Sequence, residues 1–287
     1  MEVNKAMEGF HQSPNIYVGE VNIKVKNLDN ALTFYQNIMG FQVLEKSERK
    51  AALTTDGKTT LVTLEQPENV IPKEGRMSGL YHFAILLPSR ADLSVFLRHF
   101  LGTGYPLGAA DHYVSEALYI TDPDGNGIEV YRDRPSKEWT WKNGLVDMAT
   151  EELDGNSILA ESDAEWNGLP EGTVMGHIHL HVGDLQKAEE FYTKGLGFEV
   201  VSHYPQAVFL STGRYHHHIA INTWQGVGAP TPPQNSVGLN WYTLVFPDDG
   251  ARESVVKQLQ QLGVNLQKEE NYYTTSDPSG NQIRLVL

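Results

Sequence analysis

The sequence NLDNALTFYQNIMGF at residues 27–41 decides the fold, because it returns near the middle of the chain as DLQKAEEFYTKGLGF at residues 184–198. Each copy is followed, far downstream, by a second repeated stretch: DPDGNGI at residues 122–128 and DPSGNQI at residues 277–283. Similar segments that recur in the same order indicate a tandem duplication.

The two copies differ at the residue that follows the repeated turn. Glu129 follows the first copy, and Arg284 follows the second. A carboxylate can bind a metal ion, whereas a guanidinium has only donors and cannot. We therefore expect that one copy kept a chemical function that the other lost.

Composition narrows the class of protein. A chain of 287 residues favours two domains, and no stretch approaches the roughly 20 apolar residues of a membrane span. The first fifteen residues lack the basic start and apolar core of a signal peptide. With no cysteine, any metal would be held by His, Asp or Glu. The formal charge of −14 argues against nucleic acid or an anionic membrane as a partner, so we expect a cytoplasmic protein that acts on a small molecule.

Hydrophobic periodicity divides the chain into four units, each with a strand, a helix and several further strands. In the first unit we expect a strand at residues 21–25 and a helix that Asn27 caps and Gly40 ends. In the second unit we expect the helix at residues 93–101. The pattern is that of an α+β protein with four tandem βαβββ units.

The four units form two pairs with a long connection between them. We expect an N-terminal pair at residues 1–133, an acidic linker at 134–172 and a C-terminal pair at 173–287. The linker reads as a solvated crossover. Three tryptophans indicate that parts of it pack on the rest of the protein: Trp139, Trp141 and Trp166.

Four βαβββ units with this helix signature and this Asp-Pro-x-Gly-Asn turn resemble the vicinal oxygen chelate superfamily, which contains glyoxalases, bleomycin-resistance proteins and extradiol dioxygenases. The resemblance covers nearly the whole chain outside the linker. It implies that paired units curl their strands into two half-open barrels around a metal, with ligands from the first and last strands.

The eleven histidines are unevenly spread. One group alternates along a single predicted strand, so its members share one face: His177, His179 and His181. A second group, His216–His218, follows a predicted hairpin turn near Gly213. Outside these groups, His82 opens the second unit and His112 precedes its closing strands.

Equivalent positions in the four units identify the candidate ligands. His177 lies seven residues before the helix cap Asp184, where the superfamily keeps its first-strand ligand. His82 and Glu129 hold the corresponding places in the second unit. The first and fourth units have other residues there: Glu20, Trp241 and Arg284. Two histidines and a carboxylate form the facial triad of non-haem Fe(II) oxygenases; His179 would replace His177 if the strand register slipped by two.

The detailed pattern resembles the two-domain bacterial extradiol dioxygenases, most closely the catechol 2,3-dioxygenases. In that family a tyrosine four residues before the turn proline hydrogen-bonds the substrate, and Tyr119 holds this place. The resemblance gives His217 the role of acid/base, with His216 as the alternative. His112 stands near the place of a further histidine, although its spacing to Tyr119 differs. The triad comes from the middle two units, so these must pair with each other.

The resemblance implies Fe(II), or Mn(II), and a small aromatic diol that O₂ cleaves to a 2-hydroxymuconic semialdehyde-type product. One alternative is a glyoxalase-type isomerase, although residues 219–222 offer no fourth carboxylate ligand. A thiol transferase of the same superfamily is a second alternative, and a non-catalytic protein that binds an aromatic ligand is a third.

Several features stay open in the sequence. The pattern does not choose between a catechol and a hydroquinone, nor between iron and manganese. A homo-oligomer is an alternative to a monomer, because the edges of half-open barrels often pair between subunits. Trp224 and Tyr215 are candidates for the pocket walls, with core packing as the alternative for each. Arg284 is expected to pair with Glu20.

Overall fold

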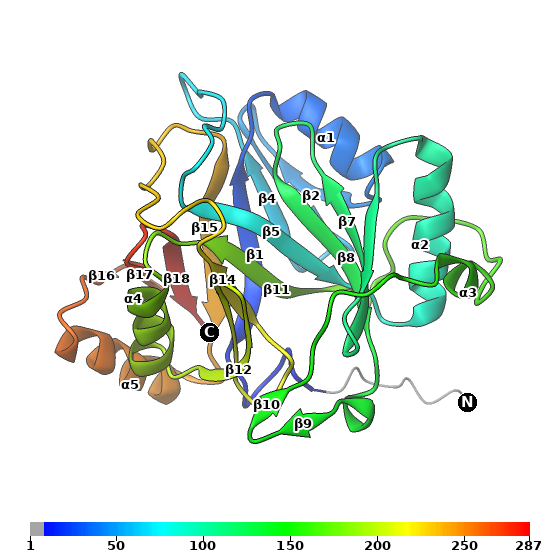
Figure 1. The fold of residues 1–287 in the computed structure, drawn as a ribbon. Helices are drawn as coiled ribbons and strands as arrows, with labels where there is room; N and C mark the ends of the chain where they lie inside the picture. The colour runs from blue at the N-terminus through cyan, green and yellow to red at the C-terminus, as the bar shows by residue number, and fades with distance from the viewer. Residues whose placement is uncertain (1–8) are drawn as a thin grey trace.

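Two large sheets dominate the computed structural model, which describes residues 9–287 (Figure 1). Within that range the chain forms two eight-stranded sheets and one two-stranded sheet. No helix among the described residues is long and apolar enough to cross a membrane. The prediction that the first fifteen residues are not a signal peptide falls partly on residues 1–8, which lie outside the described residues.

The sheet that carries the clustered histidines is built from the second and third units. Its strands, in spatial order, are β12 (Glu199–Tyr204), β13 (Ala207–Ser211), β14 (Ile219–Asn222), β11 (Val174–His181), β5 (Gly79–Leu86), β8 (Gly127–Asp133), β7 (Ser115–Thr121) and β6 (Gly108–Asp111). At the centre, β11 and β5 are antiparallel, and each has the last strand of its own unit in parallel on its other side. The middle two units therefore pair with each other, as expected.

The other large sheet joins the first and fourth units with the same topology. Its strands, in spatial order, are β16 (Gln267–Lys268), β17 (Tyr273–Ser276), β18 (Gln282–Val286), β15 (Gly238–Val245), β1 (Tyr17–Lys24), β4 (Val62–Glu65), β3 (Lys50–Thr54) and β2 (Gln42–Lys46). The predicted α+β fold of four βαβββ units is confirmed. The boundaries 1–133, 134–172 and 173–287 stay a prediction, and each sheet takes four strands from either half of the chain.

The helices lie on the outer faces of the sheets (Figure 1). They are α1 (Leu28–Asn37), α2 (Arg90–Thr103), α4 (Leu185–Glu190), its π-helical continuation η2 (Phe191–Gly195) and α5 (Asp249–Gln261). A side chain caps the start of each of these α-helices: for example, Asn27 accepts from the backbone N–H of Asn30, and Asp184 accepts from that of Lys187. The second helix begins three residues before the predicted 93–101, because Ser89 caps it.

Hydrogen bonds join the repeated helix segment to the repeated Asp-Pro-x-Gly-Asn turn in each copy. Tyr35 of α1 donates a hydrogen bond to Asp122 in the repeated turn (3.1 Å), and Tyr192 donates to Asp277 in the same way (3.2 Å). Each aspartate also accepts backbone and side-chain N–H groups of its own turn. The signature that reveals the duplication therefore joins the helix of one unit to the turn of the next.

The acidic linker is more ordered than a solvated crossover. It forms η1 (Ser136–Glu138), the hairpin β9 (Trp141–Lys142) and β10 (Leu145–Val146), and α3 (Gly155–Leu159). Trp139 is buried, and Trp166 stacks on the ring of His99 with 4.3 Å between centroids. These contacts fix the linker against the sheet that carries the histidines.

Candidate metal centre and substrate pocket

Three neighbouring strands bring His82, Glu129 and His177 to one point. These strands are β5, β8 and β11, and all three side chains are buried. Nε2 of each histidine lies 3.1 Å from Oε2 of Glu129, and the two Nε2 atoms are 3.4 Å apart. The cluster contains His177 and not His179, so the strand register is the one first expected.

The spacing of these three atoms fits a metal ion. Ligand atoms about 2.1 Å from a metal lie about 3.0 Å apart on adjacent corners of an octahedron and about 3.4 Å apart on those of a tetrahedron. The observed separations of 3.1, 3.1 and 3.4 Å fall in this range. Three protein ligands on one side of a metal ion would leave coordination positions open for small molecules.

The protonation states also suit a metal. Burial alone would raise the pKa of the Glu129 carboxyl, but interactions with His177 and His82 outweigh it and hold that pKa well below its usual range. Burial lowers the pKa of His177 to about 4, against the attraction of Glu129. At neutral pH the site thus presents a carboxylate and a neutral imidazole, the forms that bind metals. A buried carboxylate needs a compensating positive charge, which a divalent cation would supply.

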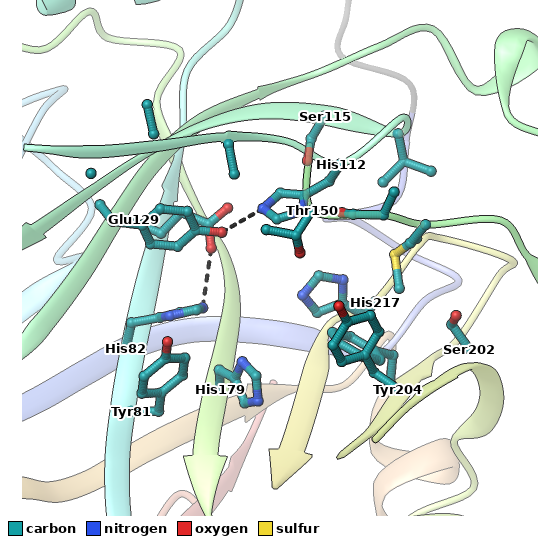
Figure 2. Close-up of a pocket in the computed structure, with 18 of the residues that line it drawn as sticks. Tyr81, His82, His112, Ser115, Glu129, Thr150, His179, Ser202, Tyr204 and His217 are labelled. Carbon is teal, nitrogen blue, oxygen red and sulfur yellow. Dashed lines mark hydrogen bonds and ion pairs between the residues drawn. The ribbon is translucent and has the colours of Figure 1, made fainter. Parts of the chain in front are cut away.

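A cavity of about 370 Å³ opens beside this cluster (Figure 2). His82 and Glu129 line it on the metal side. Much of the remaining lining is aromatic or apolar: Tyr81, Met148, Tyr204, Phe209 and Trp224. None of the lining residues is Lys or Arg. The volume and the apolar lining are typical of a small-molecule site.

The sequence suggested Trp224 and Tyr215 as pocket-wall residues, and the structure places them in different environments. Trp224 lines the cavity and is 42% exposed at its mouth. Tyr215 is fully buried, is not among the lining residues, and packs on Phe10 and Trp139. The first is thus part of the pocket, and the second belongs to the core.

Tyr119 and His112 meet at the edge of the cavity. Tyr119 lies opposite Glu129 in the β7–β8 pair, and its hydroxyl is 2.5 Å from Nε2 of His112. Nδ1 of His112 lies 2.6 Å from the carbonyl oxygen of Ala149 and must donate to it. Nε2 is then an acceptor, so the Tyr119 hydroxyl donates to His112. Burial, and next the charge of Glu129, raises the pKa of Tyr119 well above its usual value.

Of the other candidate histidines, two face the cavity and two lie behind them. His217 and His179 line the cavity (Figure 2). His216 contacts His217 through Nδ1 (2.8 Å), and His181 shares the side chain of Asn222 with His179. Burial, together with the neighbouring imidazoles, lowers the pKa of His217 well below its usual value. His217 is therefore a neutral imidazole at the cavity wall.

Sequence reasoning missed two polar residues of this region. Asp133 accepts from His216, and Asn222 fills the place where a fourth carboxylate ligand was sought. A signal existed for Asp133: it follows Glu129 by four residues on β8, and alternate residues of a strand share a face. For Asn222 the sequence carried no comparable signal.

Comparison with known proteins agrees with this geometry. Residues 17–130 and 174–285 match the model of the Glyoxalase/Bleomycin resistance protein/Dioxygenase superfamily. The chain therefore belongs to this superfamily, as its repeat signature indicated.

Individual relatives narrow the class further. The chain is 43% identical to a catechol-2,3-dioxygenase of Bacillus subtilis (strain 168) over 98% of its own length and 100% of the relative. It is 28% identical to biphenyl-2,3-diol 1,2-dioxygenase 3 of Rhodococcus globerulus, over 39% of this chain and 62% of that one. The full-length match confirms the prediction of an enzyme of the extradiol dioxygenase class.

Solved structures share the fold at low identity. Glyoxalase I from Zea mays matches with a TM-score of 0.56 and 16% identity, over 94% of this chain and 92% of that chain. The cppA protein from Streptococcus pneumoniae TIGR4 matches with a TM-score of 0.59 and 13% identity, over 96% and 98%. These similarities concern the fold alone.

Proposed function

We propose that this protein cleaves the aromatic ring of a catechol beside its two hydroxyl groups, with O₂ as co-substrate and Fe(II) held by His82, Glu129 and His177. The observation that carries the proposal is the buried His-Glu-His cluster at the wall of an apolar cavity. The full-length similarity to a catechol-2,3-dioxygenase supports it. The product would be a 2-hydroxymuconic semialdehyde-type compound.

When bound, Fe(II) would supply two things: a positive charge that eases loss of the catechol protons, and a path for electron density from the ring to O₂. The protein supplies the rest. His217 accepts a proton from the substrate at the cavity wall. The Tyr119 hydroxyl donates its proton to His112, so its oxygen can accept a hydrogen bond from a substrate hydroxyl. The apolar walls exclude water from the ring.

The glyoxalase-type alternative is less well supported by the side chains. Such a site usually needs a fourth protein ligand, and Asn222 occupies the strand that would provide it. Its amide is already engaged by His179 and His181 (2.8 and 2.7 Å). Three ligands and an apolar cavity favour the oxygenase.

The lining of the cavity also suggests which catechols bind. An anionic substituent would share the cavity with the buried carboxylate of Glu129 and would meet no Lys or Arg in the lining. Burying an unpaired charge is costly, whereas Phe209 and Trp224 offer apolar surface. We therefore propose neutral catechols, with hydrogen or an apolar substituent on the ring, as the substrate class.

The first experiment is anaerobic purification, metal analysis and addition of Fe(II), followed by catechol and air. Oxygen uptake with formation of the yellow ring-opened product, proportional to bound iron, is the expected result. Parallel samples loaded with Mn(II) decide between the two metals. A metal-loaded protein that consumes no O₂ with any catechol would overturn the proposal and favour the isomerase or transferase alternatives.

Substrate class is tested with the same assay. We expect kcat/KM for 3,4-dihydroxybenzoate to be at least about tenfold lower than for 4-methylcatechol, since the carboxylate loses its hydration without gaining a partner. A variant that places a cation at the cavity wall, Phe209→Arg, should narrow this gap. Equal rates for both compounds in the unmodified protein would contradict the neutral-substrate class.

A further inference from the structure

A chain of hydrogen bonds leads from His217 away from the cavity to a carboxylate. Nδ1 of His217 lies 2.8 Å from Nδ1 of His216, and Nε2 of His216 lies 2.8 Å from Oδ1 of Asp133. Asp133 ends β8, whereas the two histidines lie in the loop between β13 and β14. The chain therefore links the two units that build the metal centre.

The chemistry of the three groups fixes the direction of these hydrogen bonds. A carboxylate only accepts, so Nε2 of His216 carries the proton and donates to Asp133. A neutral imidazole has one N–H, so Nδ1 of His216 offers a lone pair. Nδ1 of His217 must then donate to it. His217 is left with a lone pair on Nε2.

A second chain of donors ends on the other oxygen of Asp133. Tyr215 donates to Oδ2 (2.9 Å), and the hydroxyl of Tyr131 lies 2.7 Å from that of Tyr215. The proton of Tyr215 is used on Asp133, so Tyr131 donates to Tyr215. Gly176 makes room for this arrangement, because a Cβ there would lie 2.0 Å from the Tyr131 hydroxyl oxygen. Both carboxylate oxygens of Asp133 are thus occupied by donors.

Nε2 of His217 is the end of the chain that lies farthest from Asp133. His217 lines the cavity, and its hydrogen bond to a described residue is made through Nδ1. A catechol hydroxyl in the cavity could therefore give its proton to this atom.

We infer that Asp133 is a positioning residue: acting through His216, it holds His217 in the Nδ1–H tautomer, so that a lone pair on Nε2 faces the substrate. The catalytic meaning of this tautomer rests on the proposed function. The proton that leaves the substrate hydroxyl forms the new N–H bond at Nε2, and the imidazolium keeps its Nδ1–H bond to His216. Asp133 stabilises that positive charge from two hydrogen bonds away.

The test reads the tautomer directly. Protein with ¹⁵N-labelled histidine is loaded with diamagnetic Zn²⁺, and two-bond ¹H–¹⁵N spectra identify the protonated nitrogen of each ring. The His217→Phe variant assigns the signal. We expect a single Nδ1–H form of His217 in the unmodified protein. An Nε2–H form there overturns the inference, whatever the variants do.

Variants test whether Asp133 sets the tautomer. Asp133→Asn keeps the size but offers a donor as well as an acceptor, so we expect a mixture of His217 tautomers and a kcat at least tenfold lower, with KM and iron content unchanged. Asp133→Glu should restore most of the Nδ1–H form. Tyr215→Phe removes a hydrogen bond to the same carboxylate but leaves the direction of the His217–His216–Asp133 hydrogen bonds unchanged. This variant should therefore keep the Nδ1–H tautomer of His217 and lower kcat far less than Asp133→Asn does.

Two outcomes separate this inference from the proposed function. Absence of ring cleavage by the unmodified iron-loaded protein would reject the proposed function and leave the tautomer measurement intact. A folded Asp133→Asn variant, checked by circular dichroism, whose His217 keeps a pure Nδ1–H form would reject the role of Asp133 and leave the ring cleavage intact.

Discussion

The two eight-stranded sheets of this protein share a topology but carry different side chains at the same three places. His177, His82 and Glu129 in one sheet correspond to Glu20, Trp241 and Arg284 in the other. The registers agree: His179 pairs with His82 as Asn22 pairs with Trp241, and a register shift follows each pair. The strand pairing is therefore equivalent in the two sheets, and the difference between them lies in the side chains at these three places.

The second sheet also corrects a prediction made from the sequence. Arg284 was expected to pair with Glu20, but no such ion pair occurs among the described residues. The guanidinium of Arg284 lies 3.6 Å from the ring centre of Trp241, and Thr63 donates to Glu20 instead. An aromatic face attracts a guanidinium. Trp241, at the position of His82, therefore binds the side chain of Arg284, at the position of Glu129. A fixed cation thus stands where the other sheet would bind its metal.

The largest effect that tests this comparison is expected from Glu129→Gln. The amide has the same shape but no charge, so we expect metal affinity to fall more than about 100-fold, beyond the loss typical of a ligand's hydrogen-bond partner, and turnover to disappear with it. Metal analysis and oxygen uptake measure both. The matched control is Glu20→Gln in the other sheet, which should keep full metal content and activity.

The reverse outcome would be decisive. Loss of metal in Glu20→Gln, with retention in Glu129→Gln, would place the metal in the sheet of the first and fourth units and reject the comparison.

A smaller loss is expected from His217→Phe, which removes the proton acceptor but leaves the triad in place. We predict an unchanged iron content and a kcat about 100- to 10,000-fold lower, the range of general acid–base catalysis. His203→Phe serves as the control, because His203 is exposed on β12. Loss of iron in His217→Phe would mean that this ring supports the metal site, and a normal kcat would remove it from the chemistry.

Two of the three candidate ligands could be named from the sequence because each stands at a short, fixed distance from a recognisable signal. His177 precedes the helix cap Asp184 by seven residues, and Glu129 follows the repeated turn directly. The alternative His179 was left open because a strand pattern alone does not set the register. The roles of these residues stay predictions, whereas the meeting of the three side chains is a property of the fold.

Other features depend on packing between distant segments and leave little trace in the sequence. His112 seemed badly spaced from Tyr119, yet the tight turn at Tyr113, with a φ of 68°, brings the two side chains together. The contact between His216 and Asp133 joins residues 83 positions apart. The first strand was expected at residues 21–25 but begins at Tyr17, because a register shift between Val18 and Val21 breaks the alternation.

A metal site introduced into the sheet of the first and fourth units would test whether the two sheets differ only in their side chains. The triple substitution Glu20→His, Trp241→His and Arg284→Glu places the triad at the equivalent positions, and we expect metal content to rise from about one to about two ions per chain. The variant without Arg284→Glu is the control, because the guanidinium should still repel a cation. A folded triple variant that binds a single ion would show that the strands alone do not position a metal site.

The smallest effects concern the bonds that tie each helix to the following turn. Tyr35→Phe leaves the buried carboxylate of Asp122 without one donor, so we expect the free energy of unfolding to fall by about 1–3 kcal/mol in urea denaturation. Tyr192→Phe should cost at least as much, because its hydroxyl also lies 3.0 Å from that of Tyr242. Tyr105→Phe, at an exposed position, should change stability by less than about 0.5 kcal/mol. A loss of stability in one repeat without a loss in the other would show that the two tyrosine–aspartate bonds are not equivalent, although each joins the helix of a unit in one sheet to the turn of a unit in the other.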